Sequence, residues 1–235
     1  MKTAFCFSGE LRSIDKTYPL LKEKIMDRFS DYDIFYHTWK DDPDLNKLHY
    51  FENDNHTKNI IVENRVTLDE KNYNRHLINN TKVQPLLRQL YGLEQVNNLK
   101  KEQEKQNGVL YDIVFRIRPD ILVCNNTSLE KGVETWDMKD YVYTTDHDDY
   151  GGYNDKFYFS NSVNMDILSN RREFMDYYVN LGGLLHYERF LKFAIDYSGL
   201  KLCRTSMLFT LLRTNGNFSG QLEDNNFVKI NLNNF

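Results

Sequence analysis

The opening of the chain carries a pattern of apolar runs that few folds accommodate. Residues 2–7 form a short apolar run typical of a buried strand. Apolar side chains then recur at helical spacing over residues 15–29, and the aromatic, β-prone run Asp33–Trp39 follows. A glycine-containing loop separates the first strand from the helix. This order indicates an α/β sheet built from parallel units.

Further strands and helices are expected along the rest of the chain. A long helix is predicted over residues 82–106, ended by Gly108. The remaining strands are predicted at residues 111–117, 121–124, 141–144 and 157–159, and the remaining helices at residues 163–181 and 184–197. Residues 40–80 are polar and are interpreted as a variable insertion or loop region with a short strand at Ile60–Val62. Residues 216–235 form a polar tail, and no linker divides the chain, so we expect a single domain over residues 1–235.

Composition excludes several classes of function. The net charge of -4 does not give the basic footprint of a protein that coats nucleic acid. No apolar run approaches the ~18–20 residues of a membrane span, and the apolar start ends at Phe7, which is too short for a signal-peptide core. The three cysteines suggest no disulfide framework and fit a reducing compartment. We therefore expect a cytoplasmic protein with no nucleic-acid partner and no transmembrane segment.

The loop after the first strand, Ser8-Gly9-Glu10-Leu11-Arg12, is the first candidate binding site. In open α/β sheets, ligands bind at the carboxyl ends of the strands. Gly9 lets the backbone approach a ligand, while Ser8 offers a hydroxyl group and Arg12 a forked donor suited to phosphate. The chain lacks GxGxxG and GxxxxGK(S/T), which argues against a dinucleotide or P-loop ATP site. The simpler alternative is a plain strand-to-helix turn.

The segment Arg116-Ile117-Arg118-Pro119-Asp120 is the second candidate site. Strand alternation places Arg116 and Arg118 on one face and Ile117 on the other. Two arginines on one strand face are costly to bury unless an anion meets them, and a diphosphate or internal carboxylates would serve. Asp120 follows where the strand leaves the sheet, and a carboxylate there suits a divalent ion held against a substrate phosphate. The alternative is an internal arginine–aspartate ion pair that anchors the strand.

Three further segments carry titratable side chains. The acidic loop 146–155 ends in Asp155, and it either binds metal, supplies a base or forms an ordinary acidic surface loop. Glu188 lies in the first turn of a predicted helix, where it either stabilises the helix dipole or meets a sugar hydroxyl. His37 and Trp39 end the second predicted strand. One interpretation is that both line a nucleotide pocket; the alternative is that Trp39 belongs to the core.

These segments, in this order, resemble a family of glycosyltransferase-like proteins from polysaccharide-synthesis clusters and large DNA viruses. That family opens with an apolar strand followed by Ser-Gly-Gln/Glu-hydrophobic-Arg, which Ala4–Ser13 is similar to. Asp33–Trp39 matches its D-hydrophobic-F-x-H-T-W segment, and Tyr111–Asp120 matches its YD-apolar-R-x-RPD segment. Asn154–Phe157 resembles a later segment, and Glu188 falls where the family has a glutamate leading a late helix. The resemblance covers about residues 1–200, with a gap over residues 40–80.

The resemblance implies a GT-A-like, single Rossmann-type domain with a mixed, mostly parallel sheet flanked by helices. Such a domain binds a nucleoside-diphosphate sugar, for example a UDP-sugar, and transfers the sugar to a glycan or polysaccharide acceptor. Its Mn²⁺ or Mg²⁺ ion is held by an Asp-x-Asp motif, but the matching slot here reads Arg118-Pro119-Asp120. Asp120 alone is therefore assigned to the metal, and Arg118 is a candidate for supplying positive charge that the metal otherwise gives. A viral chain would act in the host cytoplasm.

The resemblance also assigns residues to the two parts of the reaction. The nucleotide-sugar site is predicted to consist of Ser8, Gly9, Arg12, His37, Arg116, Arg118 and Asp120. Asp155 and then Glu188 are the candidates for the base that deprotonates the acceptor hydroxyl if the transfer inverts the anomeric configuration.

Two other functions stay open at this point. A non-catalytic glycan-binding or virion-associated protein can share the fold, because function depends on the site rather than on the fold. A sugar nucleotidyltransferase shares the sheet and the diphosphate site, but it normally has a longer glycine-rich loop than residues 8–12, with arginine and lysine in it.

Overall fold

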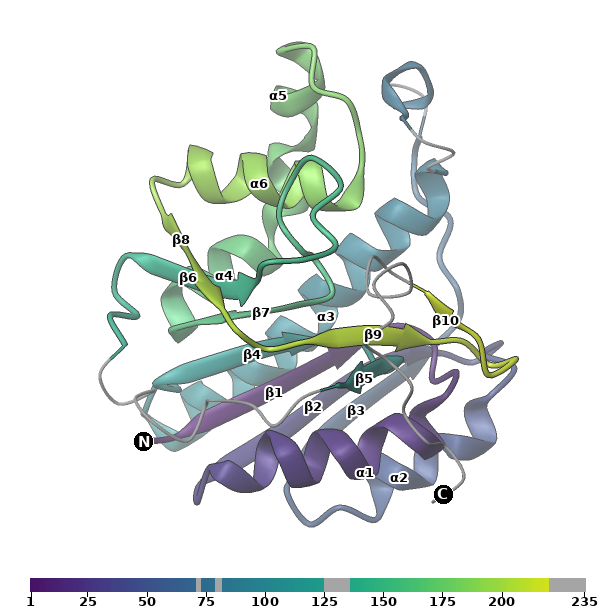
Figure 1. Cartoon of the computed structure of the whole chain (residues 1–235), viewed down its shortest axis with the longest axis vertical. Helices are drawn as coiled ribbons and strands as arrows, with labels where there is room; N and C mark the ends of the chain where they lie inside the picture. The colour runs from purple at the N-terminus through teal and green to yellow at the C-terminus, as the bar shows by residue number, and fades with distance from the viewer. Residues whose placement is uncertain (71–72, 79–81, 125–135, 220–235) are drawn as a thin grey trace.

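A seven-stranded sheet forms the centre of the structure, with helices on both of its faces (Figure 1). This computed structural model describes residues 1–70, 73–78, 82–124 and 136–219. From edge to edge the strands are β3 (Thr57–Glu63), β2 (Tyr32–Trp39), β1 (Thr3–Ser8), β4 (Ile113–Ile117), β7 (Phe157–Ser160), β6 (Tyr141–Thr145) and β8 (Lys201–Thr205). Neighbouring strands are parallel except where β7 pairs with β4 and β6. The structure therefore confirms an α/β fold with a mixed, mostly parallel central sheet.

A second, three-stranded sheet and six α-helices complete the described part. The small sheet has the order β10 (Phe218–Ser219), β9 (Phe209–Leu212) and β5 (Ile121–Val123). The helices are α1 (Ile14–Lys24), α2 (His49–Glu52), α3 (Val83–Asn107), α4 (Ser162–Ser169), α5 (Met175–Asn180) and α6 (Tyr187–Tyr197). Short 3-10 turns lie at Met26–Arg28, Leu45–Leu48, Asn74–His76 and Arg171–Phe174. Among the residues described, no helix is both long and apolar enough to cross a membrane.

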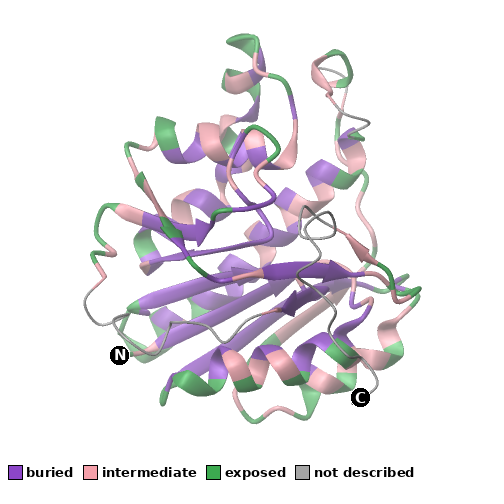
Figure 2. Ribbon diagram, viewed as in Figure 1, coloured by how far each residue is buried: buried purple, intermediate pink, exposed green. Residues whose placement is uncertain are grey.

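The two faces of the central sheet bury different side chains, because side chains alternate along a strand. On β1, Phe5 and Phe7 join the core formed with α1 and the small sheet. Ala4 and Cys6 point to the opposite face and join the core formed with α3, α4 and α6. Figure 2 shows β1, β2 and β4 buried along their lengths. The carboxyl ends of β1, β2 and β4 thus meet at one edge of the sheet, in its buried central part.

The described part of residues 40–80 belongs to the fold more closely than the sequence suggested. The short strand predicted at Ile60–Val62 is confirmed, and it extends over all of β3, which pairs in parallel with β2. Phe51 on α2 is fully buried, and its ring stacks on Tyr36 at 4.3 Å between centroids. The strand pattern was hidden because β3 is an edge strand with exposed polar side chains such as Lys58.

The helix predicted over residues 163–181 is wrong, because this stretch breaks into α4, a 3-10 turn and α5. The break has a side-chain cause. Arg171 is buried, and its Nη1 donates to the carbonyl oxygen of Leu168 at 2.7 Å and to the hydroxyl of Tyr158 at 2.8 Å. A guanidinium that bonds a last-turn carbonyl in this way ends the helix.

The last predicted helix begins later than expected, at Tyr187 instead of residue 184. Leu185 is extended there, and its amide donates to the carbonyl oxygen of His76 at 2.6 Å. Strands β8 and β9 were not predicted at all. The predicted strand over residues 121–124 is confirmed as β5, but it leaves the main sheet and pairs with β9. Most of the predicted polar tail lies outside the described residues.

Candidate functional site

A cavity of about 390 Å³ lies at the carboxyl ends of β1, β2 and β4, which is the size of a small-molecule site. Its described wall contains two carboxylates, Glu10 and Asp120, and six arginines. We call it the arginine pocket after those six: Arg12, Arg65, Arg88, Arg116, Arg118 and Arg213. Arg65 is also paired with Asp41, an acid outside the wall, at 2.9 Å, but the wall still holds more positive than negative side chains, which suits an anionic ligand.

All seven residues predicted for the nucleotide-sugar site lie in the wall of the arginine pocket. They are Ser8, Gly9, Arg12, His37, Arg116, Arg118 and Asp120. The structure brings them together because β1, β2 and β4 are neighbours and run in the same direction. The two residues predicted as catalytic bases, Asp155 and Glu188, are not part of the wall.

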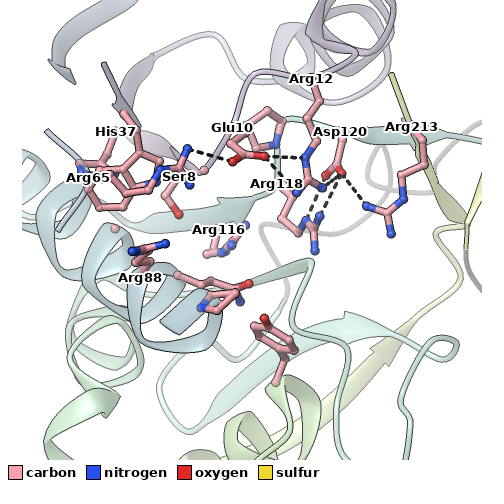
Figure 3. A pocket seen from close by; sticks show the side chains of 17 residues that line it. Ser8, Glu10, Arg12, His37, Arg65, Arg88, Arg116, Arg118, Asp120 and Arg213 are labelled. Carbon is pink, nitrogen blue, oxygen red and sulfur yellow. Dashed lines mark hydrogen bonds and ion pairs between the residues drawn. The ribbon is translucent and has the colours of Figure 1, made fainter. Parts of the chain in front are cut away.

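Asp120 is the anchor of three of the arginines (Figure 3). Arg12 Nη1 lies 2.6 Å and Arg213 Nη1 3.5 Å from Asp120 Oδ2, and Arg118 binds both carboxylate oxygens at 2.9 and 3.0 Å. Asp120 itself is only 1% exposed. Burial acts to raise the pKa of Asp120, but the charges of Arg118 and Arg12 outweigh burial and hold that pKa well below its usual range. The carboxylate is therefore ionised at neutral pH.

The loop between β1 and α1 is held in a strained conformation that presents Arg12 to the pocket. Gly9 has φ of 118° and Arg12 has φ of 48°, and the second value is unfavourable for a residue with a side chain. Side chains from β2 and the following segment hold the loop. The Tyr36 hydroxyl donates to the Gly9 carbonyl at 2.8 Å, and Lys47 Nζ donates to the Arg12 carbonyl at 2.6 Å. Such strain persists only where the surroundings fix it, and it is common at binding sites.

Arg116 differs from the other arginines because it is buried without a partner. The side chain is 1% exposed, and its Nε and Nη1 atoms have no hydrogen-bond partner among the described residues. No carboxylate of the described chain lies within ion-pair distance of it. Burial lowers the pKa of Arg116 to about 10, which still leaves the guanidinium charged at neutral pH. A buried charge without a counterion is costly, so this side chain is arranged for an anion that comes from outside the protein.

Ser8 and His37 place two more unsatisfied polar atoms in the wall. The Ser8 Oγ and His37 Nδ1 atoms are buried without a hydrogen-bond partner in the described chain. His37 Nε2 lies 2.8 Å from Glu63 Oε1. Burial lowers the pKa of His37 although Glu63 acts to raise it, so the ring is neutral at pH 7. Gly92 on α3 makes room for this ring, because a Cβ atom there would lie 3.0 Å from His37 Nδ1.

Asp155 and Glu188 lie behind the pocket wall, in contact with other charged groups. Asp155 accepts a 2.5 Å hydrogen bond from Gln89 Nε2, and Gln89 lines the pocket. Burial acts to raise the pKa of Asp155, but Lys156 and nearby arginines lower it, so the carboxylate is a weak base. Glu188 is paired with Lys156 Nζ at 2.9 Å. The catalytic roles of both acids stay predictions.

A divalent metal does not fit the residues at Asp120. Both oxygens of this carboxylate are already bonded to guanidinium groups, and the other carboxylate of the wall, Glu10, pairs with Arg65 at 3.1 Å and Arg12 at 3.4 Å. Over residues 1–70, 73–78, 82–124 and 136–219, no group of three histidine, cysteine, aspartate or glutamate side chains is placed to hold a metal ion. Magnesium and manganese prefer oxygen ligands, and here the positions around Asp120 hold cations instead.

Several residues of the wall were missed by the sequence analysis. Pro85, Arg88, Gln89 and Gly92 come from one face of α3, and their spacing of three and four residues is the signal that could have shown this face. Arg65 follows β3, in the segment that was predicted to be an insertion or loop. Arg213 follows β9, and the sequence offers no signal for its position.

Residues 1–215 match a family described as a domain of unknown function, DUF7796. The chain belongs to this family. No curated protein matches the chain. The part matched to DUF7796 runs from β1 beyond β9, so it includes every residue of the arginine pocket described above. The family description states no activity, and the function is therefore argued from the chemistry of the pocket.

We predict that Arg116→Met leaves the free protein as stable as the wild type or more stable. Methionine keeps an unbranched apolar stem in place of the arginine stem and removes a buried charge that has no counterion. Urea unfolding without ligand measures this. Arg171→Met is the matched control, since Arg171 is equally buried but bonded, and it should cost about 2 kcal/mol or more. A loss of about 3 kcal/mol in Arg116→Met would show instead that Arg116 belongs to an internal ion pair.

We predict that Asp120→Asn lowers the free energy of unfolding at pH 7 by about 3 kcal/mol, because three arginines lose their shared counterion. The pKa of Asp120 is lowered in the folded state, so its contribution is complete above the unfolded value of about 4 and is lost as the pH falls below it. The difference between variant and wild type should therefore shrink below about pH 4. The exposed Asp31→Asn serves as control and should change little. A loss below about 0.5 kcal/mol at pH 7 would contradict the anchoring role of Asp120.

Proposed function

We propose that this protein is a nucleotide-sugar-dependent glycosyltransferase whose donor diphosphate lies in the arginine pocket. The observation that carries the proposal is Arg116, a buried guanidinium without a carboxylate partner, in a wall that five other arginines share. A diphosphate supplies the missing negative charge and enough oxygen acceptors for several forked donors. The acceptor in this proposal is a glycan or polysaccharide.

The position of the pocket in the sheet supports a nucleotide ligand. Ligands of open α/β sheets bind at the carboxyl ends of the strands, and Ser8, His37 and Arg116 come from three neighbouring parallel strands at that edge. The strained loop after β1 brings Arg12 to the same edge. Trp39 lies at one side of the wall, where its ring stacks with Tyr91 at 6.0 Å between centroids. The Trp39 ring also faces the Arg65 guanidinium, 5.8 Å from the ring centroid, so this part of the wall offers an aromatic group beside a cation.

The proposed glycosyl transfer uses the positive charges of the arginine pocket. As the bond between the sugar and the diphosphate breaks, the sugar becomes oxocarbenium-like and the leaving diphosphate gains negative charge. Arg12, Arg116 and Arg118 are already in place around the cavity and do not have to be brought together during the reaction. Such preorganised donors stabilise the transition state more than the bound donor, which is what accelerates the step.

An inverting transfer also needs a base for the acceptor hydroxyl. Asp155 is the first candidate, because it is hydrogen-bonded to Gln89 of the pocket wall. Glu188 is the second candidate, and it is bound to Lys156. A retaining transfer needs no such base, so the proposal does not depend on either residue.

Release of free nucleoside diphosphate from a panel of UDP- and GDP-sugars, with thermal unfolding for binding, tests the proposed function. We expect one nucleotide to stabilise the protein by about 2.7 kcal/mol at a concentration of about 100 Kd. We also expect the matching nucleotide sugar to release its diphosphate. Arg116→Met should weaken binding by about 10- to 100-fold, because a charged hydrogen bond contributes about 1.5–3 kcal/mol. Arg75→Gln, an exposed arginine outside the pocket, is the matched control and should bind like the wild type.

Three outcomes would contradict the proposal. Binding of glycans without affinity for any nucleotide would indicate a glycan-binding protein. Formation of a nucleotide sugar from a sugar phosphate and a nucleoside triphosphate would indicate a sugar nucleotidyltransferase. Equal nucleotide binding by Arg116→Met and wild type would place the ligand outside the arginine pocket.

A further inference from the structure

The charge of the arginine pocket is already positive without any metal ion. Its six arginines face two carboxylates in the described wall, and Arg65 has a further acid partner, Asp41, at 2.9 Å, so three net positive charges remain. A diphosphate diester carries about two negative charges at neutral pH, so the arginines alone more than neutralise it. A divalent cation would add two further positive charges to a cavity whose walls repel it.

The hydrogen bonds of Asp120 also argue against a bound metal ion, because both of its carboxylate oxygens already accept from arginines. Asp120 Oδ1 accepts from Arg118, and Asp120 Oδ2 accepts from Arg12, Arg118 and Arg213. A metal ion that used either oxygen would displace a guanidinium and lie beside the remaining ones. Asp120 is thus bonded as a positioning residue, which holds three cations at one side of the cavity (Figure 3).

The three anchored arginines come from separate parts of the fold, which lets them surround one group. Arg12 follows β1, Arg118 follows β4 and Arg213 follows β9. A guanidinium has five N–H donors in a fixed plane, so Arg118, which binds Asp120 through Nε and Nη2, can still donate from Nη1 to a ligand. Arg116 adds a buried guanidinium whose Nε and Nη1 have no partner in the described chain. Anchored and unpartnered donors therefore line the same cavity.

We propose that the arginine pocket binds its diphosphate without a divalent metal ion, with the arginines held by Asp120 and the unpartnered Arg116 supplying the positive charge. This inference rests on the proposed function, since it concerns the same ligand in the same pocket. It departs from the metal that the family resemblance implied for Asp120. The leaving diphosphate is then stabilised by guanidinium groups alone.

Calorimetric titration with pyrophosphate and with UDP and GDP, in EDTA and then in Mg²⁺ or Mn²⁺, tests the inference. We expect the Kd of the bound diphosphate in EDTA to lie within about threefold of its value with metal, since the charge is supplied by arginine. We also expect the free-ion Mn²⁺ signal in electron paramagnetic resonance to be unchanged by the protein alone. Binding should weaken as salt is raised, as for any contact between exposed cations and phosphate.

One arginine variant distinguishes the two roles considered for Asp120, which are to position arginines or to bind a metal ion. Arg213→Gln removes the least buried of its three partners, and we expect it to weaken pyrophosphate binding in EDTA by about tenfold, with no recovery on adding Mn²⁺. Arg75→Gln is the control for loss of an arginine charge outside the pocket. Recovery of Arg213→Gln by Mn²⁺ would show that a metal ion binds at Asp120 and would overturn the inference.

The remaining outcomes distinguish this inference from the proposed function. Binding of pyrophosphate or a nucleoside diphosphate only when Mg²⁺ or Mn²⁺ is present would overturn metal independence and leave the glycosyltransferase proposal standing. Absence of binding with every probe, with and without metal, from a folded sample would contradict the proposed function itself, and the inference would fall with it.

Discussion

The buried Asp120 carboxylate is the interaction on which the rest of the site depends. It is 1% exposed and holds Arg12, Arg118 and Arg213, which come from the ends of β1, β4 and β9. A carboxylate buried among three guanidinium groups is stabilised by them, and each of them is fixed in direction by it. The same contacts connect the large sheet with the small one at the mouth of the cavity, since β9 belongs to the small sheet.

Arg116 is arranged in the opposite way to the arginines at Asp120, because it is buried without an acid partner in the described chain. Asp120 shows that the fold can neutralise buried arginines with an internal acid, yet none of the described acids lies within ion-pair distance of Arg116. Arg171 is also buried without an acid, but its guanidinium donates to Tyr158 and Leu168, whereas Nε and Nη1 of Arg116 have no partner in the described chain. Because an unpaired buried charge lowers stability, Arg116 is the side chain that an anion from outside the protein would stabilise most. The pocket is accordingly built in two parts. In one part Asp120 binds the arginines, and in the other the proposed ligand supplies the counterion of Arg116.

Sequence periodicity predicted the parts of the fold that depend on local pattern. Strands β1, β2 and β4 and helix α3 were expected from runs and spacing, and these strands bring Ser8, His37 and Arg116 into one wall. Contacts between segments that lie far apart in the sequence could not be predicted from local pattern. Strand β9 is recognised by its pairing with β5 and β10, and Arg213 meets Asp120 across 93 positions of sequence. Of the two alternatives for residues 116–120, the internal ion pair is present between Arg118 and Asp120, whereas Arg116 has no acid within ion-pair distance among the described residues and its functional role stays a prediction.

The central claim, that the arginine pocket receives a diphosphate, is tested most directly by a crystal structure of the protein with a nucleoside diphosphate. The account predicts phosphate oxygens within hydrogen-bonding distance of the Arg116 guanidinium and of at least one arginine held by Asp120, with Asp120 still bonded to its arginines. A nucleotide bound elsewhere, with Arg116 turned toward an acid of the protein, would contradict it.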